Sequence, residues 1–118
     1  MMLAESAMRA SLIGWLLGGV LLAALGQVLF KVGATGRSAL SEFVNPAIAG
    51  GLLCYGVGTA LWIVALSRAP LTVVYPFTAL TFVIVYAVGV MFFGEATSAQ
   101  SLVGVALILT GLFLVSTP

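Results

Sequence analysis

The segment ASLIGWLLGGVLLAALGQVLF, residues 10–30, contains no charged side chain. A helix of about 20 mostly apolar residues crosses the hydrocarbon core of a bilayer, so this segment is long enough to span it. Three further charge-free segments follow, at residues 43–67, 69–94 and 96–118. The sequence therefore predicts an all-α, polytopic membrane protein with four transmembrane helices.

The composition excludes an ordinary soluble domain. Hydrophobic residues make up 63% of the 118 residues and charged residues 6%, whereas soluble proteins carry about 25% charged residues. The chain has no histidine and a single cysteine, Cys54, so we expect no metal site built on these residues and no cofactor. No nucleophile–base pair is visible, so we expect no enzymatic activity. The net charge of +1 argues against a nucleic-acid partner.

We expect one transmembrane domain over residues 1–118, with spans at about 12–30, 46–66, 71–93 and 101–115. The connection Ser67-Arg68-Ala69-Pro70 is short, so the second and third spans should be adjacent and antiparallel. Pro76 lies within the third span and cannot donate to the helix ladder. We therefore expect a bend, and a hinge, at Pro76.

Positive charges are balanced between the two membrane faces. An even number of spans places both termini, Arg9 and Arg68 on one side, and Lys31 and Arg37 on the other. An excess of Lys and Arg in cytoplasmic loops normally orients a membrane protein, and here the counts are equal. Two explanations remain open. Either a partner or the snorkelling Lys31 fixes one orientation, or copies insert both ways and pair antiparallel.

Small residues recur on the predicted helix faces, where they let helices approach closely in lipid. Gly14 and Gly18 are four residues apart in the first span, as are Ala47 and Gly51 in the second. Both pairs are expected to pack within the bundle.

The fourth span is short and has few polar residues, so it is a candidate for a subunit interface. Thr97 and Gln100 match a capping box at its start. Gly104 and Gly111 lie one heptad apart, and close approach of helices through such residues favours association in lipid. We expect a dimer with Gly104 and Gly111 at its interface.

Polar residues in or near the spans define a candidate substrate site. Gln27 and Lys31 are four residues apart, on one helix face, and form a notch suited to a phosphate or sugar. Tyr75 and Arg68 are the other candidates for substrate binding. In an antiparallel dimer, Lys31 of one copy would lie on the same side as Tyr75 and Arg68 of the other. The alternative roles are a stop-transfer anchor for Lys31 and an interfacial tyrosine for Tyr75.

Several motifs resemble the drug/metabolite transporter superfamily, over nearly the whole chain from about Leu12. The motifs are Gly26-Gln27 followed by Lys31, Val74-Tyr75-Pro76, and the pair Gly104 and Gly111. One branch, the small multidrug resistance family, forms antiparallel four-helix dimers that exchange protons for cations. Its members carry an essential glutamate in the first span and a tryptophan three residues after the tyrosine that matches Tyr75. This chain has Ala24 at the first position, two residues before the matching Gly26, and Thr78 at the second.

A second branch contains the subunits of the aminoarabinose–undecaprenyl-phosphate flippase and related EamA-type small membrane proteins, which the same motifs also resemble. This resemblance implies a multi-pass protein of the bacterial inner membrane that moves a polyprenyl-phosphate-linked sugar across the bilayer. The expected partners are the lipid-linked sugar phosphate, membrane lipids, and a second copy or a related small subunit. Two alternatives remain: an exporter of drugs or small solutes with an altered site, and a non-transporting subunit that scaffolds a glycosyltransferase.

Overall fold

The computed structural model describes the backbone of residues 2–116 and the side chains of residues 10–116. Its elements are α1 (Met2–Ala34), η1 (Leu40–Phe43), α2 (Pro46–Leu66), α3 (Leu71–Val74), η2 (Tyr75–Phe77), α4 (Thr78–Phe92) and α5 (Ala99–Ser116). The segments long and apolar enough to cross a membrane are Ala10–Ala34, Pro46–Leu66, Leu71–Phe92 and Ala99–Ser116. The predicted all-α architecture with four membrane-spanning helices is confirmed.

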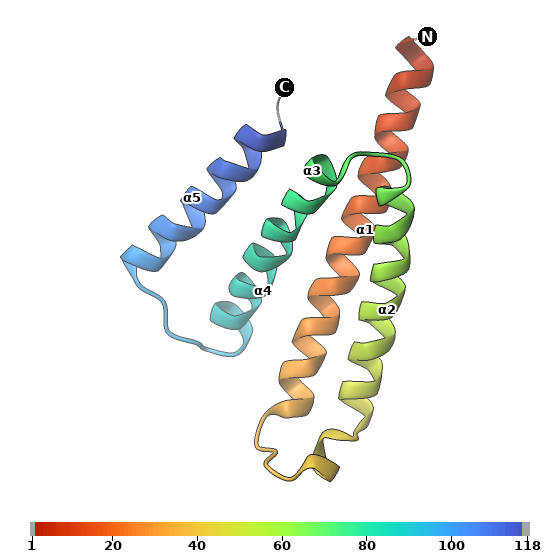
Figure 1. Ribbon diagram of the computed structural model, residues 1–118. Helices are drawn as coiled ribbons and strands as arrows, with labels where there is room; N and C mark the ends of the chain where they lie inside the picture. The colour runs from red at the N-terminus through yellow and green to blue at the C-terminus, as the bar shows by residue number, and fades with distance from the viewer. Residues whose placement is uncertain (1, 117–118) are drawn as a thin grey trace.

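The first three spans pack together, and the fourth lies at their side. α1 and α2 form a long antiparallel pair, and α4 packs against α1 (Figure 1). α5 contacts α4 and η2, and none of its residues is buried. The apolar surface of α5 is therefore free to contact lipid or another subunit.

Glycines on both helices set the distance between α1 and α2. A Cβ atom on Gly26 would lie 2.9 Å from the carbonyl oxygen of Gly51, and one on Gly58 would lie 3.1 Å from the carbonyl oxygen of Gly19. The glycines are seven residues apart on each helix, so the two pairs lie along one seam. Backbone atoms thus meet directly, which side chains would prevent.

This seam differs in part from the small-residue contacts expected from the sequence. A Cβ atom on Gly18 would lie 3.1 Å from Leu61 Cδ1, and Gly51 belongs to the seam. A Cβ atom on Gly14, in contrast, would meet nothing within 4 Å. The expectation that Gly14 packs within the bundle is therefore wrong, because no neighbouring element lies close to this glycine.

The third span loses its regular α-helical geometry around Pro76. α3 ends at Val74, the 3-10 turn η2 follows, and α4 begins at Thr78. Proline lacks the N–H that would continue the α-helical ladder. The Thr78 hydroxyl donates a hydrogen bond of 2.8 Å to the Tyr75 carbonyl oxygen. The irregularity expected at Pro76 thus takes the form of a 3-10 turn, and the role of Pro76 as a moving hinge stays a prediction.

The connection between α4 and α5 folds back onto α4. Gly94 has a φ of 66°, and the Glu95 N–H donates a 3.0 Å hydrogen bond to the Gly89 carbonyl oxygen. The left-handed conformation at Gly94, which glycine adopts readily, lets the chain turn back over the last turns of α4. The hydroxyl groups of Tyr86 and Thr97 are hydrogen-bonded to each other.

The first turn of α5 is capped by a different residue from the one expected. The Ser98 hydroxyl oxygen accepts a hydrogen bond of 3.1 Å from the Ser101 N–H. The capping box predicted for Thr97 and Gln100 is therefore wrong, because the Thr97 hydroxyl is engaged with Tyr86.

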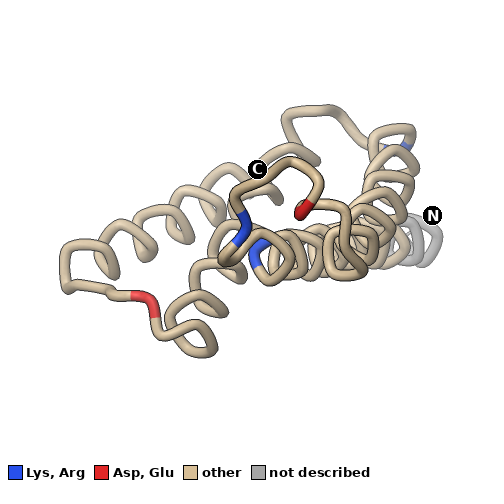
Figure 2. The backbone as a smooth tube through the Cα atoms, turned by 90° about the horizontal axis from the view of Figure 1, so that it is seen from below, with Lys and Arg blue, Asp and Glu red and all other residues tan. Residues whose placement is uncertain are grey.

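The charged residues whose side chains the structure describes lie in loops and near helix ends, as their positions along the backbone show (Figure 2). Lys31 is in the last turn of α1, Glu42 is in η1, and Glu95 lies between α4 and α5. The Arg9 side chain, which the sequence predicts on the same membrane face as Arg68, is not among the described side chains. Apart from Lys31, near the end of the first span, the four described membrane-spanning segments contain no charged residue.

Candidate substrate site

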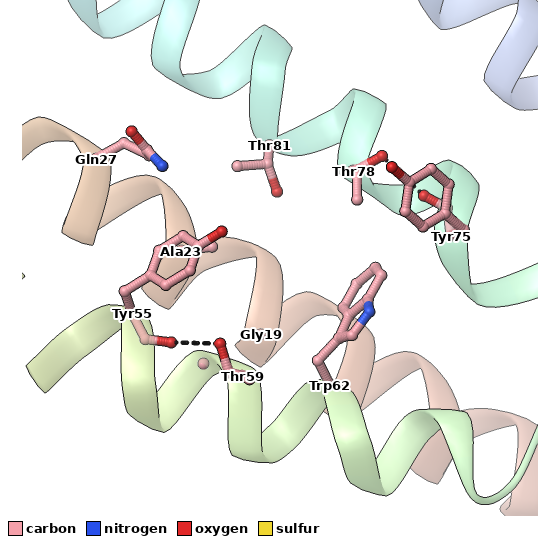
Figure 3. Close-up of a pocket in the computed structure, with 10 residues that line it drawn as sticks. Gly19, Ala23, Gln27, Tyr55, Thr59, Trp62, Tyr75, Thr78 and Thr81 are labelled. Carbon is pink, nitrogen blue, oxygen red and sulfur yellow. Dashed lines mark hydrogen bonds between the residues drawn. The ribbon is translucent and has the colours of Figure 1, made fainter. Parts of the chain in front are cut away.

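A pocket of about 340 Å³ lies between α1, α2 and the segment formed by η2 and α4 (Figure 3). Its volume lies near the lower end of the range for small-molecule sites. Its lining residues are Gly19, Ala23, Gln27, Tyr55, Gly58, Thr59, Trp62, Tyr75, Thr78 and Thr81. None of these residues is charged, so the pocket is neutral, with several polar side chains set in a largely apolar lining.

The glycine seam creates room for the pocket. Gly19 and Gly58 form one of the close pairs between α1 and α2, and both also line the pocket. Ala23, one turn after Gly19, adds only a methyl group to the same wall. Small residues therefore leave a hollow at a point where two helix backbones are almost in contact.

Several polar groups in the pocket are available to a ligand. The Thr59 hydroxyl donates 2.9 Å to the Tyr55 carbonyl oxygen, which leaves its oxygen able to accept. Within residues 10–116, no hydrogen bond is recorded for the side chains of Gln27, Trp62 or Thr81. A carboxamide or hydroxyl without a partner in lipid carries a desolvation cost that a bound ligand could relieve.

The aromatic side chains come from two elements. Tyr55 and Trp62 extend from α2, and Tyr75 extends from η2 (Figure 3). The Tyr55 ring packs against Phe30 of α1, with ring centroids 6.1 Å apart. Aromatic rings from α2 and η2 therefore form part of the pocket wall.

The structure brings together two of the four predicted substrate-binding residues. Gln27 and Tyr75 both line the pocket, whereas Lys31 and Arg68 do not. Arg68 donates 3.4 Å to the Ser11 hydroxyl oxygen, and its guanidinium carbon lies 5.8 Å from the centre of the Trp15 ring.

The two cations lie at opposite ends of the first span. Arg68 contacts Ser11 near the start of this span, and Lys31 is in the last turn of α1. Lys31 is twenty positions after Ser11 in this helix, which corresponds to about 30 Å along the axis. Within one chain, Lys31 and Arg68 therefore cannot hold the same ligand group.

Tyr75 also lines a second, apolar groove of about 440 Å³. The other residues of this groove are Leu71, Thr72, Pro76 and Val115, so it lies between the third span and the end of α5. The Tyr75 side chain is 62% exposed. The same tyrosine thus forms part of the polar pocket and part of the apolar groove.

The sequence prediction of the site omitted the wall formed by α2 and part of the wall formed by α4. Tyr55, Thr59 and Trp62 lie at positions i, i+4 and i+7 of α2, and Thr78 and Thr81 lie three residues apart on α4. Such spacing places residues on one face of a helix. The spacing could have shown that each set shares one helix face, but not which neighbouring helix that face meets.

The two glycines predicted at a dimer interface lie on an open face of α5. A Cβ atom on Gly104 or on Gly111 would meet nothing within 4 Å. Neither glycine is therefore needed for packing within the chain, and their role in association stays a prediction.

The sequence matches the EamA-like transporter family over residues 1–117. It is 37% identical over 117 residues to the probable 4-amino-4-deoxy-L-arabinose-phosphoundecaprenol flippase subunit ArnF of Sodalis glossinidius, which covers 89% of this chain and 90% of that protein. It is 33% identical over 103 residues to the probable flippase subunit ArnE of Pseudomonas savastanoi pv. phaseolicola, with 83% and 90% covered. No solved structure matches the chain. With four membrane-spanning helices and a family match over almost its whole length, this chain is a multi-pass membrane protein that belongs to the EamA-like transporter family.

Proposed function

We propose that this chain is a flippase subunit that moves a polyprenyl-phosphate-linked sugar across the bacterial inner membrane. Its relatives in Sodalis glossinidius and Pseudomonas savastanoi are named as probable subunits of such a flippase. The observation that carries the proposal is the position of Tyr75, which lines both the neutral polar pocket and the apolar groove. A polar space and an apolar space that share one wall match a cargo with a polar head and an apolar tail.

The pocket would shelter the sugar while it passes through lipid. Sugar hydroxyl groups lose their hydrogen bonds to water on entering a bilayer, and each unpaired group raises the free energy. Gln27, Thr81 and Trp62 have side-chain groups that could replace those bonds. The head of the lipid would therefore cross next to α1, α2 and α4 rather than through the acyl chains.

The groove beside Tyr75 would guide the start of the polyprenyl tail. Leu71, Pro76 and Val115 give it an apolar lining, and isoprenoid carbon remains in contact with apolar surface at little cost. The phosphate, which joins head and tail, would then lie close to Tyr75. The Tyr75 hydroxyl can donate a hydrogen bond to a phosphate oxygen.

The two cations would act at the membrane faces. Lys31 and Arg68 lie at opposite ends of the first span, and either can pair with a phosphate. In an antiparallel dimer, Lys31 of one copy would lie on the same side as Arg68 and Tyr75 of the other. Each face of the membrane would then present a lysine and an arginine to the phosphate.

The transporting unit would be a dimer that associates through α5. This helix is apolar and has no buried residue, and Gly104 and Gly111 leave room for a close helix partner. The chain resembles relatives named as ArnE and relatives named as ArnF. The partner would therefore be a second copy or a related small subunit.

Movement of a lipid-linked sugar from one leaflet of a liposome to the other tests the proposed function. The chain, alone and together with any small subunit that co-purifies with it, is reconstituted with 4-amino-4-deoxy-L-arabinose-phosphoundecaprenol, the lipid for which the relatives are named. A non-permeant reagent that oxidises sugar diols then measures how fast the sugar changes leaflet. We expect faster flipping than in protein-free liposomes, and slower flipping with Lys31→Ala. Equal rates with and without protein in both preparations would contradict the proposal.

A further inference from the structure

We infer that Arg68 binds the phosphate of the lipid-linked cargo at one membrane face, and that Trp15 positions the Arg68 guanidinium for this role. The inference rests on the proposed function and names the residues that would receive the charged part of the cargo before the sugar enters the pocket. Arg68 belongs to the short connection between α2 and α3, and its side chain is exposed. A phosphate ester carries a negative charge, and a guanidinium can pair with it through parallel hydrogen bonds.

Two residues of α1 hold the Arg68 side chain. Its guanidinium donates a hydrogen bond of 3.4 Å to the Ser11 hydroxyl oxygen, and the guanidinium carbon lies 5.8 Å from the centre of the Trp15 ring. An aromatic ring attracts a cation through its face and uses none of the N–H donors of the cation. Because a guanidinium has more donors than Ser11 can use, the remaining N–H groups of Arg68 are available to a phosphate.

The Trp15 ring is itself held by the core at this end of the bundle. It packs against a cluster of three buried residues, Leu16 of α1, Ala65 of α2 and Val74 of α3. The guanidinium is therefore attracted to a ring whose place is fixed by three helices. A side chain that is ordered before its ligand arrives loses less conformational entropy on binding, so this contact favours phosphate binding at Arg68.

No carboxylate among the described side chains competes for Arg68. Glu42 lies in η1 and Glu95 lies in the connection between α4 and α5. Both segments are at the end of the bundle opposite to the connection between α2 and α3 (Figure 1). Within residues 10–116, Arg68 is thus a cation without a counterion, and its charge is available to an anionic ligand.

The stripe of α1 that holds Arg68 continues into the pocket. Residues four apart are neighbours on a helix surface, and Ser11 and Trp15 are followed at this spacing by three pocket residues, Gly19, Ala23 and Gln27. Gly19 lies four residues after Trp15, which corresponds to about 6 Å along the axis. A phosphate on Arg68 would therefore hold the attached sugar at the near end of the pocket.

Two lipids that differ only in the phosphate test the role of Arg68. Undecaprenyl phosphate and undecaprenol are titrated against the detergent-solubilised chain, and native mass spectrometry measures the fraction of protein that binds each lipid. Arg68→Gln should lower the affinity for undecaprenyl phosphate by about tenfold, as for the loss of a hydrogen bond to a charged group. Its affinity for undecaprenol should be unchanged, which also shows that the variant is folded.

Arg37→Gln is the matched control for Arg68→Gln. Arg37 is also exposed, but it lies beyond the other end of α1, where its Nε donates a hydrogen bond of 3.3 Å to the Gly33 carbonyl oxygen. This variant should bind both lipids as the wild-type protein does. Where Arg68→Gln fails to fold, Arg68→Lys takes its place and should also lower the affinity for undecaprenyl phosphate, because lysine lacks the planar set of donors.

A double-mutant cycle tests the positioning role of Trp15. Trp15→Leu should weaken binding of undecaprenyl phosphate by about threefold, the effect of losing an exposed cation–π contact, and Trp15→Phe, which keeps an aromatic ring, should lose less. In an Arg68→Gln background, Trp15→Leu should have no further effect, because the two residues act through one contact. A purely structural role of Trp15 would instead weaken binding of both lipids in either background and would contradict the positioning role.

The outcomes separate this inference from the proposed function. Unchanged affinity of Arg68→Gln for undecaprenyl phosphate, or equal losses in Arg68→Gln and Arg37→Gln, would overturn the inference. In the liposome assay, flipping at the same rate by the wild-type protein and by Arg68→Gln would reject the inference and leave the proposed function standing. Binding that depends on Arg68, without any flipping by the wild-type protein, would support the phosphate site and contradict the proposed function.

Discussion

A Cβ atom on Gly26 would lie 2.9 Å from the carbonyl oxygen of Gly51, and a Cβ atom on Gly51 would lie 3.0 Å from the carbonyl oxygen of Gly26. This reciprocal contact holds α1 against α2 and continues, seven residues along each helix, into the contact of Gly19 with Gly58. The second contact forms part of the pocket wall. Helix packing and the candidate site therefore depend on the same seam.

The first prediction concerns the stability of this seam. Gly26→Ala should destabilise the protein by about 1–3 kcal/mol, the usual cost of inserting atoms into a well-packed contact. The affected neighbours are backbone atoms, which cannot move aside as a flexible side chain can. Reversible unfolding in mixed detergent micelles measures the effect.

Gly14→Ala is the matched control for Gly26→Ala. A Cβ atom on Gly14 meets nothing within 4 Å, and alanine favours a helix over glycine by about 1 kcal/mol. We therefore expect an unchanged or slightly higher stability for Gly14→Ala. Equal losses of stability in the two variants would show that the glycine seam is not what holds α1 to α2.

The second prediction concerns Pro76. Pro76→Ala restores an N–H to the third span, so we expect the 3-10 turn at Tyr75–Phe77 to become continuous α-helix. Binding of the lipid-linked sugar should persist, because the pocket residues remain, whereas the flipping rate should fall if the turn is a hinge. Binding is measured by the fluorescence of Trp62 in a Trp15→Phe background, where Trp62 is the single tryptophan of the two in the sequence. Flipping is measured in liposomes with the same preparation.

Pro46→Ala serves as the control, because Pro46 is the first residue of α2, a position where proline interrupts no helical hydrogen bond. This variant should flip lipid at the wild-type rate. If Pro76→Ala also flips lipid at the wild-type rate, the third span does not move about a hinge at this residue.

The third prediction concerns association through α5. Gly104→Leu and Gly111→Leu should each weaken the dimer, because a bulky side chain separates helices that meet through small residues. Each should leave the fold of the single chain intact, since neither glycine has a neighbour within 4 Å. Energy transfer between labelled copies in liposomes measures association.

The control for this prediction lies on another helix. Gly56 on α2 also has open space around it, so Gly56→Leu adds the same side chain on a different face and should preserve the dimer. Loss of association in Gly56→Leu alone, with the α5 variants unaffected, would move the interface from α5 to α2.

The fourth prediction follows from the balance of charges at the membrane faces. If copies pair antiparallel, a reporter fused to the C-terminus should give a signal on both sides of the membrane. Two added lysines in the loop that contains Arg37 should then bias all copies to one orientation, as the rule for positive charges predicts. A signal from only one side in the unmodified chain would instead favour a fixed orientation and a distinct partner subunit.

The spans could be predicted from the sequence because bilayer thickness and charge position limit where a helix can cross. The first span was predicted to end at residue 30, whereas the structure continues it to Ala34. Lys31 does not end the helix, because a long side chain at the end of a span can reach the headgroup layer while the backbone stays helical.

The contribution of α2 to the pocket was harder to predict. Tyr55 and Thr59 face the pocket only because Gly51 and Gly58 fix how α2 is rotated against α1. That rotation depends on two helices at once, so it is not contained in the pattern of either one. The seven-residue spacing shared by the glycines of both helices was the signal that could have revealed it.

The four substrate-binding residues were predicted from the chemistry of their side chains, but the structure brings only two of them together. Gln27 and Tyr75 come together in the pocket, whereas Arg68 contacts Ser11 and Trp15 near the start of the first span. Sequence alone could not place the Arg68 side chain, since a residue in a short connection can turn toward either neighbouring helix.

The most direct test of the account compares the two glutamines of the chain in the liposome flipping assay. Gln27 lines the pocket, and Gln100 lies exposed in the first turn of α5. Gln27→Ala should slow flipping of the lipid-linked sugar by about tenfold, the effect of one polar group left unpaired in lipid, whereas Gln100→Ala should leave the rate unchanged. Equal rates for both variants and the wild-type protein would contradict the claim that this pocket carries the sugar across the membrane.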